Sequence, residues 1–152
     1  IEDMMDLMDE GCDFVSCTRY AYGGRRLGGS LFGGIASRTG NRIFRFLSGS
    51  VFTDSTTGIK MFRKSLFNGI KLEAKPIGWA VVFELAIKVQ AAGYRLGEVP
   101  IISIDRLYGG QSTFTLGPWF KEYLKWFLWG VKRLHRMRLK KPMVRIPKST
   151  VK

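Results

Sequence analysis

The sequence has few of the residues on which many enzymes build their chemistry. Its 152 residues include two cysteines, Cys12 and Cys17, and one histidine, His135. Two cysteines cannot form a disulfide framework and give too few soft ligands for a zinc site, so we expect two ordinary buried thiols in a reducing compartment. A single histidine in a basic segment argues against Ser-His-Asp and Cys-His mechanisms and against a histidine-ligated metal.

Long apolar runs are also missing, because none reaches the roughly 18 residues needed to span a bilayer. The first residues do not resemble a signal peptide. The chain does not begin with a methionine, and it opens inside a helical pattern. We therefore expect the chain to be a fragment whose upstream half is absent.

Acidic residues are scarce after residue 13. Six of the twelve Asp and Glu residues lie in the first 13 positions, and all 25 Lys and Arg residues follow them. The formal net charge of the chain is +13, and 45% of its residues are apolar, enough for the core of one domain. A positive field attracts nucleic acid, anionic lipid headgroups or phosphorylated small molecules, and charge alone does not distinguish among them.

Alternating helix and strand patterns predict an α/β layered domain. The helical patterns cover residues 1–10, 31–48 and 79–94. The strand patterns cover residues 13–18 and 95–104, with Pro100 at an expected edge. Residues 59–67 indicate a strand running into a short helix. In the second helix, the expected packing face consists of Ile35, Ile43, Phe44 and Leu47.

Residues 118–139 predict an amphipathic helix. At about 100° per residue, Lys121, Lys125, Lys132 and Arg136 lie on one side and large aromatic and aliphatic residues on the other. A helix at the membrane interface is one interpretation, and a helix docked on the core with a solvated basic face is the other. Residues 140–152 indicate a basic tail that is disordered or leads into a segment outside this chain, so the expected division is 1–117, 118–139 and 140–152.

Polar side chains recur beside glycines at the ends of the predicted elements. The clusters are Arg19 with Gly23 and Gly24; Ser37, Arg38 and Asn41 after Gly33 and Gly34; Asp54 to Gly58, followed by Lys60; and Arg106 with Gly109, Gly110 and Ser112. Accessible backbone N–H groups, hydroxyls and guanidinium groups are typical of phosphate sites. Each cluster alone also fits the loops of a basic protein, but together they favour a site for a phosphate-bearing ligand.

The order of these motifs resembles the C-terminal part of family 2 glycosyltransferases, in the branch of the dolichol-phosphate mannosyltransferases and related polyprenyl-phosphate glycosyltransferases. The resemblance covers about residues 1–130, through DFVSCTRYAYGG, SRTGNRIFRFLSG, TDSTTGIKMFRKS, FELAIKVQAAGYRLGEVPI and DRLYGGQSTF. Its most specific pieces are TDSTTG before a basic-aromatic run, and EVPI before RLYGGQS.

The resemblance implies the acceptor-side part of a GT-A domain, a Rossmann-like α/β fold, followed by an amphipathic C-terminal helix. Members of this branch transfer a hexose, with inversion, from a GDP- or UDP-sugar to a polyprenyl or dolichyl phosphate. The implied location is the cytoplasmic face of a membrane, with peripheral attachment or anchors outside this chain. The implied Mg²⁺ or Mn²⁺ is held by an Asp-x-Asp motif expected upstream of Ile1, so no metal ligand is expected in this chain. The resemblance also implies no nucleic-acid partner.

The resemblance also implies roles for individual residues. It assigns acceptor or donor phosphate contacts to Arg19, Ser37, Arg38, Arg106 and Ser112. Asp54 fills the acid of the TDSTTG turn as the catalytic candidate, where it would orient the sugar or an arginine, unless it only caps its turn. Gly33 stands where some relatives carry a basic residue, and Arg38 or Arg26 would then supply that charge.

Glu84 and Lys60 are further candidates. Glu84 occupies the region where other GT-A enzymes place a catalytic base, but its helix is expected to be buried and Lys88 can pair with it four residues on. These features favour a structural role. An acceptor phosphate is already an anion, so its attack requires no strong general base.

Three alternatives remain open from the sequence. The first is a family 2 glycosyltransferase with another lipid or a polysaccharide as acceptor. The second is a basic nucleic-acid-binding module, although the aromatics cluster on one helix face rather than alternating with Lys and Arg. The third is a membrane-interface protein without catalysis, which would leave Asp54 and Arg106 without a role.

Overall fold

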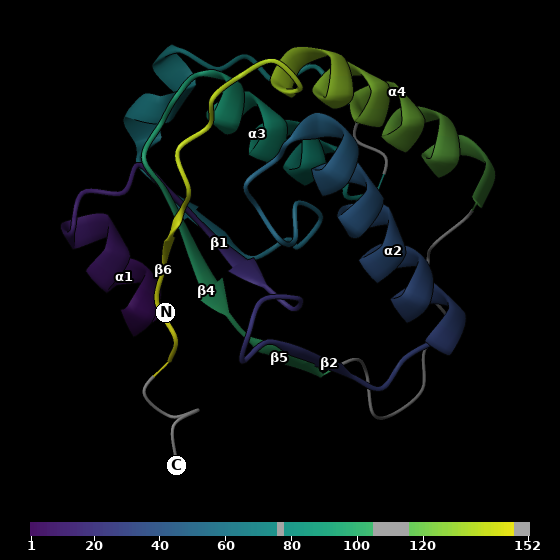
Figure 1. The fold of residues 1–152 in the computed structure, drawn as a ribbon, viewed down its shortest axis with the longest axis horizontal. Coiled ribbons are helices and arrows are strands. Elements are labelled where there is room, and N and C mark those ends of the chain that lie inside the picture. Colours follow the sequence, from purple (N-terminus) through teal and green to yellow (C-terminus); the bar gives the residue numbers. More distant parts are fainter. Residues whose placement is uncertain (76–77, 105–115, 148–152) are drawn as a thin grey trace.

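The computed structural model describes residues 1–75, 78–104 and 116–147, and its centre is a mixed four-stranded sheet (Figure 1). The strand order is β3-β1-β4-β6. The strands are β1 (Phe14–Thr18), β3 (Lys60–Phe62), β4 (Leu96–Pro100) and β6 (Met143–Val144). β4 pairs in parallel with both β1 and β6, and β3 is antiparallel to β1. This parallel-rich sheet confirms the predicted α/β class and is consistent with a Rossmann-like fold.

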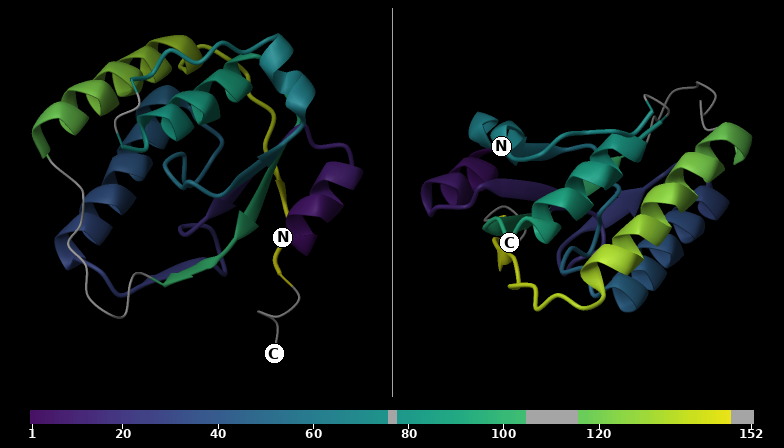
Figure 2. Two further views of the ribbon diagram at one scale, coloured as in Figure 1. Left: turned by 180° about the vertical axis from the view of Figure 1, so that it is seen from behind. Right: turned by 90° about the horizontal axis from the view of Figure 1, so that it is seen from above.

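The two central strands, β1 and β4, are buried along their whole length. Phe14 and Leu96 pack against α3 (Ala80–Ala91). Val15 and Val99 instead pack against α1 (Glu2–Asp9), so the two helices cover opposite faces of the sheet (Figure 2). Because side chains alternate along a strand, Ser16, Thr18 and Glu98 lie on the same face as Phe14 and Leu96. The carboxyl-terminal half of that face is therefore polar.

Two long helices, α2 (Leu31–Ser48) and α4 (Leu116–Leu134), pack against one another, and α4 also lies on α3 (Figures 1 and 2). Phe44, Phe83 and Trp126 form part of their shared core. A Cβ on Gly130 would lie 2.8 Å from the Phe44 ring, so glycine permits the close approach of α4 to α2. This arrangement encloses α3 on nearly all sides, as its apolar sequence predicts.

The helix over residues 31–48 forms as predicted, but its expected packing face is wrong. Ile35 is 67% exposed, and Ile43 and Leu47 are also exposed, whereas Phe44 is buried. The buried residues of α2 are Asn41, Phe44 and Ser48. Two of these are polar: Asn41 bonds the turn at residues 55 and 56, and Ser48 bonds the Phe44 carbonyl oxygen and the Ser50 N–H. Hydrophobic periodicity alone therefore pointed to the wrong side.

The C-terminal segment corrects two further expectations. Met143 and Val144 form β6 beside β4, with Met143 opposite Gly97, so the predicted disorder of the tail is wrong for these residues. β6 also makes β4 an internal strand rather than an edge. Pro100 is the last residue of β4, where a missing N–H is tolerated because the strand ends.

The remaining short elements are a second, two-stranded sheet and a 3-10 helix. β2 (Arg25–Leu27) pairs in parallel with β5 (Ile102–Ile104), and both follow closely after the central strands. The chain after β3 forms the 3-10 helix η1 (Lys64–Asn68), as the pattern of residues 59–67 predicted. Residues 25–27 lie outside the predicted helix and strand patterns and form one strand of this small second sheet.

α4 combines docked and exposed apolar residues. Trp126 and Leu134 are 2% and 0% exposed, and the Phe127 ring lies 5.3 Å from that of Phe44. Phe120 and Leu128 are 61% and 58% exposed. The docked interpretation therefore describes part of this helix, while other large apolar side chains face outward. Among residues 1–75, 78–104 and 116–147, no helix is long and apolar enough to cross a membrane.

Candidate functional site

The candidate site lies at the carboxyl end of β1, where three segments meet. The chain leaving β1 contributes Arg19 and Tyr20, the turn over residues 53–57 contributes Asp54, and the middle of α2 contributes Ser37. In open parallel sheets, ligands bind beyond the carboxyl ends of the strands, and this is the end at which β1 and β4 both finish. The fold therefore brings together three of the four predicted clusters.

The centre of the site is an ion pair between Arg19 and Asp54. Arg19 Nε donates to Asp54 Oδ2 at 2.6 Å, and Arg19 Nη2 donates to Asp54 Oδ1 at 3.0 Å. The Asp54 side chain is fully buried, whereas the Arg19 side chain is 16% exposed. Asp54 also accepts the backbone N–H of Thr56 at 3.2 Å. The acid thus both caps its turn and fixes the plane of the guanidinium.

Two hydroxyl groups lie close to Arg19 Nη2, the nitrogen that also donates to Asp54 Oδ1. Arg19 Nη2 lies 3.2 Å from Thr56 Oγ1 and 3.5 Å from Ser37 Oγ. Tyr20 Oη donates to Ser37 Oγ at 2.8 Å. Thr56 Oγ1 donates to Asp54 Oδ1, whereas Ser37 Oγ accepts both of its contacts and keeps its own proton for a phosphate group beside the partly exposed arginine.

Asn41 connects α2 to the turn that carries Asp54. Its Nδ2 donates to Thr56 Oγ1 at 2.9 Å and to the carbonyl oxygen of Ser37 at 2.9 Å. Its Oδ1 accepts the backbone N–H of Ser55 at 2.8 Å. The side chain is 6% exposed, and with three hydrogen bonds it sets the position of the turn relative to the helix.

Further cations lie around this cluster. The Arg19 and Arg38 guanidinium carbons lie 4.9 Å and 6.0 Å from the centre of the Tyr20 ring. Arg26 Nη1 would lie 3.7 Å from a Cβ on Gly34, so its side chain also reaches the start of α2. Of the two candidates for the basic charge near Gly33, Arg26 therefore reaches the start of α2, whereas Arg38 lies near the Tyr20 ring.

Lys60 lies beside the site on β3. Its Nζ donates to Ser16 Oγ at 3.0 Å and lies 5.5 Å from the centre of the Phe14 ring. Burial lowers the pKa of Lys60 to about 8, although the negative charges of Asp54 and Glu98 oppose the shift. This candidate therefore contributes a buried amine behind the ion pair of Arg19 and Asp54.

Glu98 is a residue that sequence reasoning missed. It is 1% exposed on β4 and accepts the backbone N–H of Thr53 at 2.7 Å. Burial raises the pKa of Glu98, and hydrogen bonds from Thr53 partly offset the increase. The available signal was an acid inside the buried strand LGEVP, which is rare unless the acid has partners.

Glu84 has partners elsewhere. It is fully buried in α3, where its two carboxylate oxygens accept the backbone N–H groups of Glu73 and Ala74, each at 2.7 Å. Lys88 Nζ lies 2.6 Å from the same carboxylate. Glu84 thus anchors residues 73 and 74 to α3, a geometry that fits the structural role.

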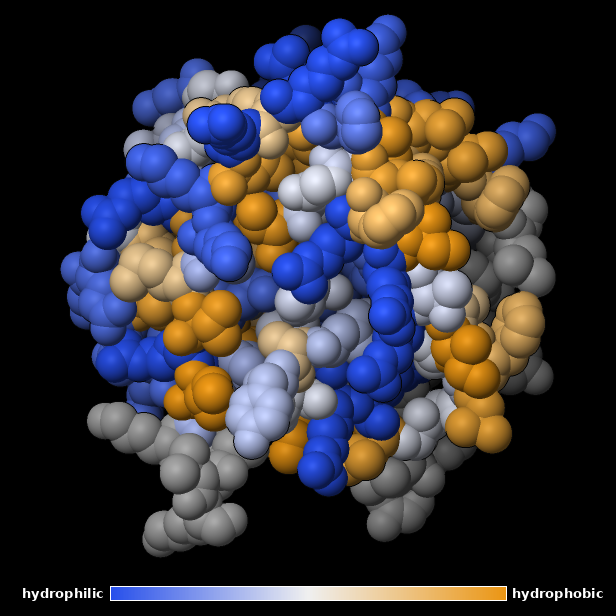
Figure 3. Space-filling view, in the orientation of Figure 1, coloured by the Kyte–Doolittle hydropathy of each residue, from blue (hydrophilic) through white to orange (hydrophobic). Residues whose placement is uncertain are grey.

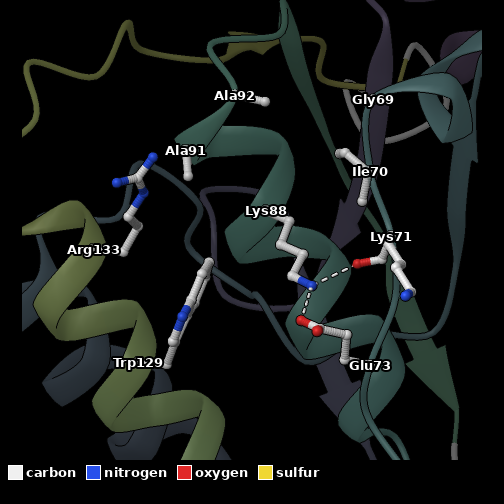
Figure 4. Close-up of a pocket in the computed structure, with 9 residues that line it drawn as sticks. All are labelled: Gly69, Ile70, Lys71, Glu73, Lys88, Ala91, Ala92, Trp129 and Arg133. Carbon is white, nitrogen blue, oxygen red and sulfur yellow. Dashed lines mark hydrogen bonds and ion pairs between the residues drawn. The ribbon is translucent and has the colours of Figure 1, made fainter.

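A pocket of about 440 Å³ lies over this anchor, between the chain around residues 69–73, α3 and α4 (Figure 4). Lys88 projects into it and donates to Glu73 Oε2 and to the carbonyl oxygen of Lys71. Trp129 and Arg133 line the opposite wall. Burial opposes the charge of Lys88, but the hydrogen bonds that it donates to Glu73 and Glu84 outweigh this effect and raise the Lys88 pKa. The Lys88 amine is thus engaged in ion pairs and hydrogen bonds that hold residues 71 and 73 against α3.

Two predicted site residues, Arg106 and Ser112, lie outside the described residues. Within the parts of the chain that the structure describes, no group of three or more His, Cys, Asp or Glu side chains could hold a metal ion. The two carboxylates nearest the site, Asp54 and Glu98, are occupied by an arginine and by backbone N–H groups. The described residues therefore do not fit a divalent metal.

Comparison with known proteins adds two similar sequences. A polyprenol monophosphomannose synthase of Mycolicibacterium smegmatis is 30% identical over 114 residues, which are 70% of this chain and 40% of that protein. A dolichyl-phosphate hexose transferase of Haloferax volcanii is 31% identical over 101 residues, 64% of this chain and 40% of that protein. The chain thus spans about two fifths of the length of these relatives. No protein-family model matches the chain.

Proposed function

We propose that this chain is the acceptor-side part of a family 2 glycosyltransferase that transfers a hexose from a nucleotide sugar to a polyprenyl or dolichyl phosphate. The observation that carries the proposal is the geometry of Arg19, whose guanidinium is fixed by buried Asp54 beside the Ser37 and Tyr20 hydroxyls. The names of the two similar proteins support a prenyl-phosphate acceptor and a sugar donor.

The proposed role of the site is to hold the acceptor phosphate. One phosphate oxygen attacks the anomeric carbon of the sugar, the bond to the nucleotide diphosphate breaks, and the configuration at that carbon inverts. Because the attacking oxygen already carries negative charge, the chain needs to supply orientation and positive charge rather than a base. We assign these roles to Arg19 and Arg38, with Ser37 as a hydroxyl donor.

Asp54 has a supporting role in this proposal. Its side chain is fully buried behind Arg19, and it accepts two hydrogen bonds from that guanidinium. Of the roles considered for this acid, orientation of an arginine fits the geometry, and capping of its turn accompanies it. A fixed guanidinium loses less conformational entropy when the phosphate binds.

The donor and the divalent metal belong to another part of the enzyme in this proposal. The described residues lack a carboxylate cluster for Mg²⁺ or Mn²⁺. The chain covers 40% of the length of its relatives, which leaves room for an upstream half that carries an Asp-x-Asp motif and reads the GDP- or UDP-sugar. No step of the chemistry assigned to this chain passes through the metal.

We also propose that the enzyme works at the cytoplasmic face of a membrane. Leu31, Phe32 and Phe46 of α2 are 85%, 77% and 85% exposed. In the orientation of Figure 1, Figure 3 shows hydrophobic groups on the side where α2 and α4 lie, next to a hydrophilic band. Exposed apolar groups among arginines and lysines suit the headgroup region of an anionic bilayer. An acceptor with a long apolar chain is available only at such a surface.

The test is a transfer assay with the longer protein that contains this chain. Labelled hexose from GDP-mannose or UDP-glucose should appear on polyprenyl phosphate, and Arg19→Ala should reduce the rate by about a hundredfold or more. Arg45→Ala removes an exposed arginine of α2 and serves as the control. Near-wild-type transfer by Arg19→Ala, or transfer to a non-phosphorylated acceptor only, would reject the proposal.

A further inference from the structure

A buried chain of hydrogen bonds leads from the sheet to the Arg19–Asp54 pair. It starts at Glu98, which is 1% exposed and lies on the face of β4 that points toward the site. Its Oε1 accepts the Thr53 backbone N–H at 2.7 Å and the Thr53 hydroxyl at 3.0 Å. The backbone N–H of Asp54 is a further donor to this carboxylate. Glu98 therefore holds the segment that carries Asp54.

This series of hydrogen bonds continues to the segment that carries Arg19. Thr53 Oγ1 lies 2.6 Å from Thr18 Oγ1. Thr18 Oγ1 in turn accepts the backbone N–H groups of Tyr20 and Ala21 at 3.1 Å and 3.3 Å. The two loops that meet in the Arg19–Asp54 pair are thus joined behind it by two hydroxyl groups.

The direction of each bond in this chain follows from the supply of protons. A hydroxyl group carries a single proton, and that of Thr53 is donated to Glu98. Thr18 must then donate its own proton to Thr53, which leaves its lone pairs for the Tyr20 and Ala21 N–H groups. Every donor points toward Glu98, so the arrangement depends on a carboxylate that only accepts.

Charge does not explain why this carboxylate is buried. In the parts of the chain that the structure describes, no ion pair joins Glu98 to a cation; the Lys60 amine interacts with it only through the field and donates to Ser16 Oγ instead. A buried acid that stabilised only the core could be replaced by an apolar residue at little cost. Its bonds are directed instead at backbone groups of the site.

We propose that Glu98 is a positioning residue for the Arg19–Asp54 pair and acts through Thr53 and Thr18. The carboxylate fixes Asp54 directly and fixes Arg19 through the two hydroxyls, so the guanidinium is already in place before a phosphate group arrives. The effect on phosphate binding rests on the proposed function, whereas the effect on the position of Arg19 does not.

The first measurement needs no ligand. In the 152-residue chain, the Arg19 Nε–H proton should exchange slowly with water, because it is bonded to Asp54 at 2.6 Å. Thr53→Val and Thr18→Val remove one hydroxyl each and keep the side-chain shape. Both variants should speed exchange of that proton by about tenfold or more, as should Glu98→Gln, which replaces an acceptor oxygen by an NH₂ donor. Thr39→Val, at an exposed position of α2, is the control.

The second measurement is the affinity for farnesyl phosphate. Thr53→Val and Thr18→Val should each weaken it by about fivefold to tenfold, with an unchanged affinity in Thr39→Val. Unchanged exchange of the Arg19 Nε–H proton in folded Thr53→Val and Thr18→Val would overturn the positioning role. If the variants speed exchange but the wild-type chain itself does not bind farnesyl phosphate, the positioning role is upheld and the proposed function is rejected.

Discussion

Asp54 accepts two hydrogen bonds from a single guanidinium, from Arg19 Nε at 2.6 Å and from Arg19 Nη2 at 3.0 Å. The acid is fully buried, while the arginine keeps 16% of its side chain exposed. Asp54 therefore lies behind Arg19 and out of reach of a bulky ligand. Removal of Arg19 would leave a buried carboxylate without its cation, and the resulting loss of stability can be measured.

Removal of Arg19 should destabilise the fold. Arg19→Met would leave the Asp54 carboxylate buried without its cation, which costs about 3 kcal/mol in the free energy of unfolding. The double variant Arg19→Met with Asp54→Asn should recover part of this loss. Urea unfolding curves measure both, and a cost below about 1 kcal/mol for Arg19→Met would contradict the assigned pairing.

Asn41 should matter as much as a core residue. Asn41→Leu keeps the approximate volume but removes three hydrogen bonds and leaves the Ser55 N–H unpaired, so the loss should be about 2 kcal/mol or more. The adjacent Arg42→Leu alters an exposed position of the same helix and is the control. Equal unfolding midpoints for the two variants would show that Asn41 does not hold the turn.

The lowered pKa of Lys60 predicts a specific dependence of the free energy of unfolding on pH. Its pKa falls from 10.5 to about 8 on folding because the amine is buried. Between these values the unfolded chain binds the extra proton, so the free energy of unfolding should rise with pH across this window. The rise should be about 3 kcal/mol relative to Lys60→Met, in which the effect is absent.

The control for this experiment is the pH range below about 7. There Lys60 is protonated in both states, so the stability difference between wild type and Lys60→Met should be constant. Parallel stability curves for the two proteins from pH 7 to pH 10.5 would show that burial does not perturb this amine.

Glu84 should affect stability without affecting ligand binding. Glu84→Gln replaces one acceptor of the Glu73 and Ala74 N–H groups by a donor, so the expected loss is about 1 to 3 kcal/mol. The affinity of the folded variant for farnesyl phosphate should equal that of the wild type. A large loss of affinity at unchanged stability would instead assign Glu84 to the site.

The exposed apolar residues at the start of α2 should bind membranes. Leu31→Ser with Phe32→Ser should reduce co-sedimentation with vesicles of anionic lipid by about tenfold or more. Phe67→Ser changes another exposed aromatic residue, in η1, and should leave co-sedimentation nearly unchanged. If both proteins co-sediment as well as the wild type, the membrane contact lies elsewhere.

The sequence predicted most elements because their signals are local. The buried strand Phe14–Thr18 is a short apolar run, and α3 is apolar on all sides because it lies between the sheet and α4. β6 could not be predicted, because a strand of two residues has no periodicity and depends on pairing with β4.

The candidate site was predictable only in part. Arg19, Ser37 and Asp54 each stand beside glycines or hydroxyls, which is a local signal, and the fold brings them together. Glu98 has no such signal, since its importance comes from a partner 45 residues away in the chain, Thr53. The packing face of α2 was missed for a related reason, because Asn41 is buried by hydrogen bonds rather than by hydrophobicity.

The most direct test of a phosphate-binding site is calorimetry of the 152-residue chain with farnesyl phosphate and with farnesol, which share an apolar tail. We expect wild type and Arg45→Ala to bind farnesyl phosphate at least about tenfold more tightly than farnesol, and Arg19→Ala to lose that preference. Equal affinities of the wild-type chain for the two compounds, or a preference that survives Arg19→Ala, would contradict a phosphate site built on Arg19.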